Sequence, residues 1–333
     1  MNGSPPLEEL QRQSSWLLLH SVADPTRAQY TAQYRTYREF ARFYNLQAFP
    51  LSEHTLMLFA TYLSNKGASH KGVKRYMAAL NFFAHILGYH NVFASAPGLA
   101  RLVRGIKRFQ GNTATRPKRT PITPLLLRQM GRSLFRSPML YADKVMIWAA
   151  MMTAFFGFLR ISEYTSKLVR SFDPSTTLCV GDVSVAHTTA AIKLKSSKTD
   201  PFRQGVTVRL AANGSSLCPI KALKLYQQYA PARSGPFFQF ADGRYLTRRG
   251  LMGVLTLIKP HDVDNVSTHS FRIGAATAAA AAGYPRWAIQ AMGRWSSDCY
   301  RQYIRITDNT ISSMSQAMAF IPIVNFPTYD PDN

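Results

Sequence analysis

The segment that most restricts the fold of this chain is the apolar run LYADKVMIWAAMMTAFFGF, residues 140–158. A helix formed by these residues would be hydrophobic on every side, and such a helix is stable in water only when other elements cover it. Asp143 and Lys144 interrupt the run too early for it to span a bilayer. We therefore predict that residues 140–158 form the buried helix of a sizeable globular domain.

The charge of the chain indicates a polyanionic partner. Its 333 residues include 40 Lys and Arg against 17 Asp and Glu, which gives a formal net charge of +23. Nucleic acid is the commonest polyanion that such a protein binds, and an anionic membrane surface is the alternative. The sequence has no apolar run of about 18 residues, and MNGSPPLEELQRQSS lacks the basic start and apolar stretch of a signal peptide. We therefore favour nucleic acid, and we expect neither membrane insertion nor secretion.

The three cysteines, Cys179, Cys218 and Cys299, are too few and too scattered for a disulfide framework or a zinc knuckle. A reducing compartment fits this usage. We predict no metal and no cofactor, and we interpret Cys299 as a packing residue.

The first hundred residues have the pattern of a helical bundle. In PTRAQYTAQYRTYREFARFY, residues 25–44, aromatic side chains recur at helical spacing while arginines occupy much of the remaining surface. Asp24 before Pro25 is typical of a helix start. We interpret the aromatic stripe as core. Short breaks that contain Gly or Asn separate further predicted helices at about 52–65, 71–87 and 97–109.

A basic stretch follows this bundle. The fourth predicted helix ends in ARLVRGIKRFQ, and the next segment, GNTATRPKRTPITP, has three prolines and no apolar periodicity, which marks the clearest domain boundary in the chain. The plain interpretation is a solvated linker, but beside so basic a helix we favour contact with a DNA backbone. The two clusters also fit a nuclear import signal. The candidate DNA-binding residues are Arg101, Arg104, Lys107, Arg108, Arg116, Lys118 and Arg119.

The residues beyond 123 predict a mixed domain. LCVGDVSV, AAIKLK and GVTVRL are short β-branched runs separated by turns, which is typical of a three-stranded antiparallel sheet. Helical patterns return at about 219–230, 246–258, 268–282, 285–292 and 296–305. The predicted fold class is therefore mainly α, with a helical bundle and a mixed α/β domain. The predicted divisions are a flexible N-terminus (1–20), the helical domain (21–111), a basic linker (112–122), the mixed domain (123–306) and a C-terminal tail with a short helix (307–333).

Two stretches place arginines where they can bind a phosphate. In STHSFRIGAAT, the serine or threonine before His269 can cap a helix, so that His269 and Arg272 lie on one face near its N-terminus. A helix N-terminus attracts anions and a guanidinium matches phosphate geometry, whereas the plain alternative is a capping histidine and a surface arginine. In GFLRISEY, Glu163 either forms an ordinary ion pair with Arg160 or holds that arginine toward a phosphate oxygen.

Two further stretches carry groups that can transfer protons or attack. KLKSSKTDPFRQG, residues 193–205, lies between two predicted strands, so Lys198 is expected near a turn tip. Most loop lysines only keep a protein soluble, but a lysine whose pKa is lowered by neighbouring cations can donate a proton to a leaving oxygen. Lys195 is the second candidate for that role. In GRWSSDCYRQYIRI, Tyr300 and Tyr303 lie one helical turn apart, and each is either a core tyrosine or a nucleophile.

The order of these residues resembles that of a known family. Arg160, Lys198, His269-x-x-Arg272, Trp295 and Tyr303 follow one another as in the tyrosine site-specific recombinases, also called the phage integrase family. The resemblance covers roughly residues 20–315 and includes the bundle, the basic linker and the mixed domain. The sequence motifs THSFRIGAAT and GRWSSDCYRQYIRI are most similar to those of the recombinases of DIRS- and Ngaro-type retroelements.

The resemblance implies a core-binding, SAM-like bundle and a catalytic domain with assigned roles. Tyr303 is implied as the nucleophile because it precedes IR, as in the family pattern, with Tyr300 a packing neighbour. Trp295 stands where many relatives have histidine, and its separation of eight residues from Tyr303 is one shorter than in many relatives. The other implied roles are phosphate binding by Arg160 and Arg272 with help from His269 and Trp295, general acid catalysis by Lys198, and support of Arg160 by Glu163.

The resemblance also implies a reaction. Double-stranded DNA would be cleaved and rejoined through a 3′-phosphotyrosyl intermediate, without metal or ATP, by four protomers on two DNA sites and through a Holliday junction. The result would be site-specific recombination or integration of a mobile element, in the nucleus of a eukaryote or otherwise in the cytoplasm. A type IB topoisomerase and a non-catalytic DNA-binding protein are the alternatives. The tail helix predicted within 307–323 packs either on its own domain or, as the family suggests, on a neighbouring protomer.

Overall fold

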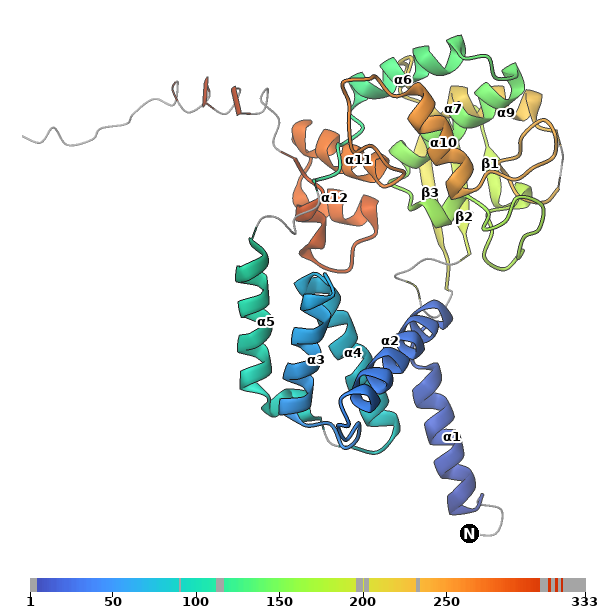
Figure 1. Ribbon diagram of the computed structural model, residues 1–333. Helices are drawn as coiled ribbons and strands as arrows, with labels where there is room; N and C mark the ends of the chain where they lie inside the picture. The colour runs from blue at the N-terminus through green and yellow to red at the C-terminus, as the bar shows by residue number, and fades with distance from the viewer. Residues whose placement is uncertain are drawn as a thin grey trace, which may run out of the picture. The chain divides into compact units, whose positions relative to one another are not determined.

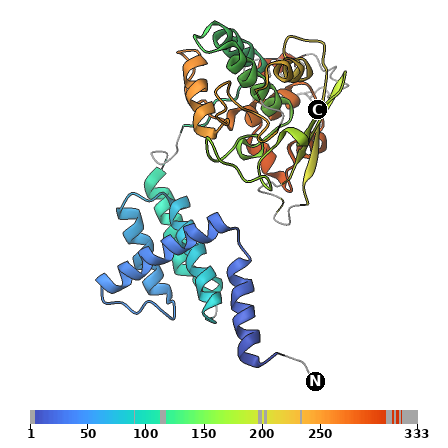
Figure 2. The ribbon, with the colours of Figure 1, turned by 90° about the vertical axis from the view of Figure 1, so that its right-hand side faces the viewer.

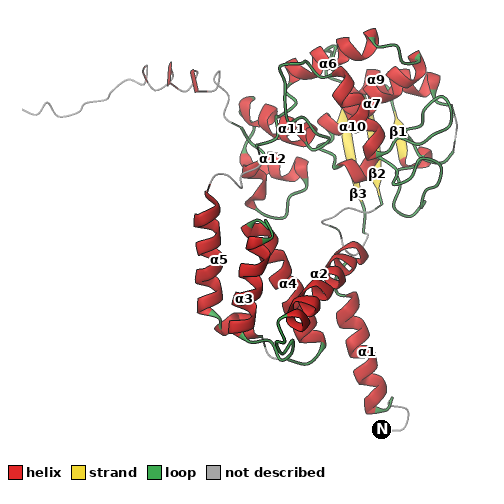
Figure 3. Ribbon diagram, in the orientation of Figure 1, coloured by secondary structure: helices red, strands yellow, loops and turns green. Residues whose placement is uncertain are grey.

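The computed structural model describes residues 5–89, 91–111, 117–195, 200, 204–231 and 234–305, together with residues 311, 312, 315, 316 and 319. The chain divides into two compact units, Met1–Pro117 and Lys118–Asn333 (Figure 1). Among the described residues, the first unit is helical and the second combines helices with one three-stranded antiparallel sheet (Figure 3). The predicted fold class is thereby confirmed.

The first unit is a bundle whose core is aromatic. It consists of α2 (Asp24–Phe43), α3 (Glu53–Asn65), α4 (His70–Ile86) and α5 (Pro97–Gln110), with the 3-10 turn η1 (Val92–Ser95) before α5. These helices confirm the ones predicted. Tyr37 and Phe40 of α2 are buried and pack on the ring of Phe59, so the aromatic stripe is core as interpreted.

A helix that the sequence analysis does not predict precedes this bundle. The sequence predicts a flexible N-terminus for residues 1–20, whereas the structure has α1 (Leu7–His20), which runs away from α2–α5 in Figure 2. No residue of α1 is buried, so the helix shows none of the burial pattern from which the others were predicted. Local effects favour it instead, because Glu8 and Glu9 interact with the helix dipole in its first turn.

The second unit is organised around the predicted buried helix. α7 (Tyr141–Phe156) has fully buried side chains on several faces, such as Met146, Ile147 and Met151. The prediction for residues 140–158 is therefore confirmed. The helices that pack against α7 are α6 (Pro124–Arg136), α9 (Pro219–Tyr229) and α11 (Ser270–Ala281), and α10 (Arg248–Ile258) in turn packs on α6.

The predicted sheet is also confirmed. β1 (Val183–Val185), β2 (Thr189–Leu194) and β3 (Val206–Ala211) pair antiparallel in the order β1-β2-β3. Ala190, Ile192 and Leu194 of β2 are buried while the residues between them are more exposed, which is the alternation expected of a strand with one face on a core.

Helix α6, which follows the basic, proline-rich stretch, was not predicted from the sequence. Its start is nevertheless encoded locally: the Thr123 side chain accepts a hydrogen bond from the Leu126 N–H, and Pro124 occupies the first turn. The buried residues Leu127, Met130 and Leu134 then follow at helical spacing.

The end of the predicted linker belongs to the second unit. Residues 112–116 lie outside the described residues, and Lys118 and Arg119 are exposed. Thr120, however, donates from its N–H to the Asn265 carbonyl at 3.3 Å, and the Ile122 N–H donates to the Ser270 carbonyl at 3.1 Å. Ile122 is wholly buried. The prediction of a linker up to residue 122 is therefore too long, because an apolar residue and two backbone contacts fix its last part.

No helix among the described residues is long and apolar enough to cross a membrane. Most of the segment 307–323, where a tail helix is predicted, lies outside the described residues. The described positions 311, 312, 315, 316 and 319 are helical and exposed.

The close approach of Ile122 to α11 gives a test of this packing. A Cβ on Gly274 would overlap the carbonyl oxygen of Ile122, so we expect Gly274→Ala to lower the free energy of unfolding by about 1–3 kcal/mol or more. Gly253 of α10 has nothing near its Cβ position, so Gly253→Ala should be neutral or should stabilise by about 0.5–1 kcal/mol. Urea unfolding followed by circular dichroism measures both, and equal effects would contradict the packing.

Candidate active site

Arg160 is presented by the turn that follows α7. It caps the short helix α8 (Ile161–Tyr164) and forms the predicted ion pair with Glu163. The Arg160 backbone N–H donates to Glu163 Oε2 at 2.8 Å, and Arg160 Nη1 donates to Glu163 Oε1 at 2.9 Å. The Glu163 side chain is 1% exposed and that of Arg160 16%. Within the described residues, Nε and Nη2 of Arg160 have no hydrogen-bond partner, so these N–H groups remain available for an anion.

His269 and Arg272 come from the start of α11. His269 precedes the first residue of the helix without forming a capping hydrogen bond, and its ring centroid lies 5.1 Å from that of Tyr303. Arg272 is wholly buried. Its Nη1 and Nη2 donate to the backbone carbonyls of Phe158 and Gly293, and its guanidinium carbon lies 4.2 Å from the centroid of the Trp295 ring. This arrangement is a cation–π contact in a dry environment.

The two tyrosines differ sharply in their surroundings. They lie on a 3-10 turn, η4 (Asp298–Gln302) and the residue after it, rather than on the helix predicted over 296–305. The Ser297 side chain before this turn forms no capping hydrogen bond, so an α-helix lacks that stabilising start here. Tyr300 is 2% exposed and belongs to the core. Tyr303 is half-buried, with its ring 5.1 Å from the Trp295 ring and 6.0 Å from the Arg272 guanidinium carbon.

The structure therefore brings five of the six predicted catalytic residues into one cluster: Arg160, His269, Arg272, Trp295 and Tyr303. The sixth, Lys198, lies outside the described residues. Lys195, the second candidate for its role, is bound elsewhere, with its Nζ 2.6 Å from Asp182 Oδ2. Burial works against its charge, but the hydrogen bond to Asp182 and the negative charges of Asp182 and Cys179 together outweigh burial and raise the pKa of Lys195 above its usual range. A raised pKa makes a lysine a poorer proton donor, so the surroundings of Lys195 do not suit a general acid.

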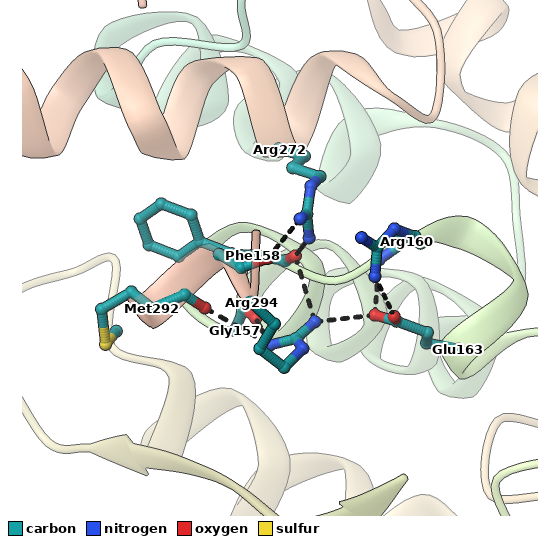
Figure 4. A network of polar contacts seen from close by, with 8 residues as sticks. Gly157, Phe158, Arg160, Glu163, Arg272, Met292 and Arg294 are labelled. Carbon is teal, nitrogen blue, oxygen red and sulfur yellow. Dashed lines mark hydrogen bonds and ion pairs between the residues drawn. The ribbon is translucent and has the colours of Figure 1, made fainter. Parts of the chain in front are cut away.

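One arginine of this cluster was not predicted from the sequence. Arg294 ends helix α12 (Arg286–Gly293), and its Nη2 donates to Glu163 Oε2 at 2.8 Å (Figure 4). The only sequence signal was its position between Gly293 and Trp295, because its partners lie more than a hundred residues earlier in the chain.

The predicted DNA-binding residues are solvent-accessible wherever the structure describes them. On α5, Leu99, Val103 and Ile106 face the core. The basic residues Arg101, Arg104, Lys107 and Arg108 are all exposed on the remainder of this helix. Lys118 and Arg119 are exposed in the second unit, and Arg116 lies outside the described residues.

The cluster has an excess of positive charge. Burial and, to a smaller extent, the charges of Arg119, Arg272 and Arg160 together lower the pKa of His269 to about 4. Burial also lowers the pKa of Arg272 to about 9, with Arg160 and Arg294 acting in the same direction and Glu163 opposing them. At neutral pH, His269 is therefore uncharged and Arg272 remains a cation. Within the described residues, no three His, Cys, Asp or Glu side chains come together as a metal site requires.

Comparison with known proteins places this geometry in a known fold. No family model and no curated protein matches the chain. Among solved structures, the Tn1549 transposon integrase in complex with circular intermediate DNA is similar over 89% of this chain and 94% of that chain, with a TM-score of 0.56 and 16% identity. A lambda integrase tetramer bound to a Holliday junction is similar over 91% of this chain and 78% of that chain, with a TM-score of 0.55 and 12% identity. The XerH site-specific recombinase bound to palindromic difH substrate is similar over 81% of this chain and 72% of that chain, with a TM-score of 0.54 and 15% identity. The chain thus has the fold of the integrases and site-specific recombinases.

The pKa of His269 predicts how stability depends on pH. Because its folded-state pKa of about 4 lies below the usual 6.5, the unfolded chain takes up the proton first. The contribution of His269 to stability is complete above about pH 6.5 and is lost as the pH falls toward about 4. We expect wild type to lose more free energy of unfolding between about pH 7 and pH 5 than His269→Gln does, as measured by urea denaturation at each pH. The same pH dependence in both proteins would show that His269 is not buried in its neutral form.

Proposed function

We propose that this protein cleaves and rejoins double-stranded DNA through a covalent bond between Tyr303 and a 3′ phosphate. The position of Tyr303 carries the proposal: its ring lies against His269 and beside Arg272, in a cluster that also contains Arg160. Within the described residues its hydroxyl has no hydrogen-bond partner. Tyr300, by contrast, is buried in the core and cannot reach a DNA backbone.

The reaction assigns a role to each group. The Tyr303 Oη attacks phosphorus while the bond from phosphorus to the 5′ oxygen breaks, which leaves a 3′-phosphotyrosyl enzyme and a free 5′-hydroxyl. Neutral His269 accepts the tyrosine proton, and Lys198 donates a proton to the leaving oxygen. Arg160 and Arg272 stabilise the charge that builds on the non-bridging oxygens. The bound phosphate also raises the pKa of His269, because its negative charge offsets the arginines that hold this pKa down.

Access to the phosphate requires a rearrangement. Arg272 is wholly buried beneath Trp295, and two of its nitrogens donate to backbone carbonyls. A phosphate oxygen reaches this guanidinium only when the segment that carries Trp295 and Tyr303 shifts. Arg160 is partly exposed and has free N–H groups, so it makes the first contact.

DNA binding follows from charge and exposure. A net charge of +23 favours association with a polyanion, and each phosphate neutralised by Lys or Arg releases counterions. We assign backbone contacts to the exposed basic residues of α5, to Arg116 and Lys118, and to Arg119. The charge of Arg119 lowers the pKa of His269, which supports a contact of Arg119 near the reacting phosphate.

Rejoining gives the proposed reaction its biological outcome. A 5′-hydroxyl from a partner strand attacks the phosphotyrosine, so the energy of the bond is conserved and ATP is unnecessary. The similar structures include a lambda integrase tetramer on a Holliday junction, which favours four protomers acting on two DNA sites. The sequence motifs THSFRIGAAT and GRWSSDCYRQYIRI favour a recombinase of a mobile element of the DIRS or Ngaro type. Such a recombinase would act in the nucleus of a eukaryotic host or otherwise in the cytoplasm.

Two alternatives make different predictions. A type IB topoisomerase would reseal the same strand, so it would relax supercoils without exchanging strands. A non-catalytic DNA-binding protein would form no adduct at all. Incubation with two labelled duplexes that carry the same site, followed by denaturing electrophoresis, separates all three: exchanged strands indicate a recombinase, an adduct without exchange indicates a topoisomerase, and neither indicates a binding protein.

Removal of the nucleophile tests the assignment of Tyr303. Tyr303→Phe removes one hydroxyl and should abolish the covalent adduct on a suicide duplex, while DNA affinity stays within about twofold of wild type. Tyr300→Phe is the matched control, because Tyr300 lies in the core and should leave adduct formation intact if the fold is kept. Adducts formed by Tyr303→Phe, or lost only in Tyr300→Phe, would refute the assignment.

The leaving-group role of Lys198 has its own test. Lys198→Ala should slow cleavage of an ordinary phosphodiester by roughly 100-fold or more. The Lys198→Ala protein should cleave a 5′-bridging phosphorothiolate at nearly the wild-type rate, because the sulfur leaving group needs no protonation. Lys195→Ala should show no such difference between the substrates, because Lys195 is paired with Asp182. Equal defects of Lys198→Ala on both substrates would exclude Lys198 as the general acid.

A further inference from the structure

Arg294 occupies a backbone position that usually favours glycine. It ends α12 in the left-handed conformation, with φ 53° and ψ 46°. A side chain strains this conformation by about 1–2 kcal/mol, which is why helices so often end on glycine. A residue that keeps such strain is held there by its contacts, and residues of this kind cluster at functional sites.

The side chain of Arg294 joins two distant segments. It is 14% exposed, and its Nη1 donates to the Gly157 carbonyl at 3.1 Å. Its Nη2 donates to Glu163 Oε2 at 2.8 Å and lies 3.4 Å from the Phe158 carbonyl oxygen. Figure 4 shows these contacts between Arg294 and the turn after α7. Because Arg294 directly precedes Trp295 in the chain, they tie the turn between α7 and α8 to the segment that carries Trp295 and Tyr303.

Phe158 connects this contact to the second phosphate-binding arginine. Its φ of 50° is also left-handed. Its carbonyl oxygen accepts hydrogen bonds from both Arg272 Nη1 and Arg294 Nη2. A continuous set of contacts therefore runs from Arg272 through the Phe158 carbonyl to Arg294, and through Glu163 to Arg160.

We propose that Arg294 is a positioning residue that holds Arg160 and Arg272 in a common geometry for one phosphate without touching DNA itself. This inference rests on the proposed function. Arg294 occupies Glu163 Oε2, so Arg160 uses only Nη1 of its guanidinium to bind that carboxylate. Without Arg294, Glu163 has a free lone pair in a dry pocket, and Arg160 closes on it with a second N–H. The phosphate then loses a donor.

Replacement of Arg294 should affect the reaction and not DNA binding. We expect Arg294→Met to slow adduct formation under single-turnover conditions by roughly 10- to 100-fold, because small errors in position are costly at a reacting phosphate. DNA affinity, measured by fluorescence anisotropy, should stay within about twofold of wild type. Arg286→Met is the control, since Arg286 is an exposed arginine at the other end of α12. Adduct formation at the wild-type rate in Arg294→Met, or a loss fully explained by weaker DNA binding, would overturn the proposal.

A second variant and a double mutant exclude a purely structural role. Arg294→Gly removes the same guanidinium while relieving the strained backbone, so it keeps the test valid if Arg294→Met folds poorly. If Arg294 acts through Arg160 as well as Arg272, its replacement in an Arg160→Ala background should slow adduct formation several-fold less than its replacement in wild type, because only the effect through Arg272 remains. A full additional loss in that background would show that Arg294 acts independently of Arg160, and the proposal would fail.

A measurement without DNA separates this inference from the proposed function. The backbone N–H of Arg160 donates to Glu163 Oε2, the same oxygen that Arg294 binds. If Arg294 holds this carboxylate in place, hydrogen exchange of the Arg160 amide should become faster in Arg294→Met but not in Arg286→Met. Unchanged exchange in Arg294→Met would overturn the proposal. If wild type forms no adduct on any DNA, the proposed function fails, while the exchange result still decides whether Arg294 holds Arg160.

Discussion

Glu163, with a side chain only 1% exposed, contacts the guanidinium groups of both Arg160 and Arg294. Arg272 lies in the same cluster, so three cations share one carboxylate in a pocket where charges are poorly solvated. Backbone carbonyls accept hydrogen bonds from these arginines but supply no net charge. Burial is the largest cause of the depressed pKa values of His269 and Arg272, and the surplus of neighbouring cations adds to it. In the proposed reaction a phosphodiester would bring the missing negative charge, and a transition state with more charge on its oxygens would be stabilised further.

The backbone around the cluster is shaped to aim carbonyl groups at these cations. Phe158 and Arg294 both adopt left-handed conformations, and each lies next to a glycine. A Cβ on Gly293 would overlap the Trp295 ring, so only glycine lets that ring approach α12. Trp295 can then cover Arg272 with its face. The resemblance to the tyrosine recombinases leads us to expect a histidine at this position in many of them, whereas the indole of Trp295 can donate one hydrogen bond but cannot carry a proton.

Periodicity predicted the parts of the fold that depend on burial: α7, the bundle of the first unit, and the sheet. It also predicted the pair of Arg160 and Glu163, because residues three apart on a helical turn meet. Periodicity gave no signal for α1, which buries nothing, or for Arg294, whose ion pair with Glu163 joins residues 131 positions apart. Such contacts depend on where two distant turns meet, and neither turn alone encodes the other.

The spacing from Trp295 to Tyr303 shows how a local conformation can absorb a change in length. The separation is eight residues, one shorter than the resemblance to the tyrosine recombinases leads us to expect. The intervening segment, however, contains the five-residue 3-10 turn η4 in place of an α-helix. A 3-10 helix rises about 2.0 Å per residue against about 1.5 Å for an α-helix, so five residues gain about 2.5 Å. That gain exceeds the rise of one α-helical residue, and at this separation the Tyr303 ring contacts the rings of His269 and Trp295.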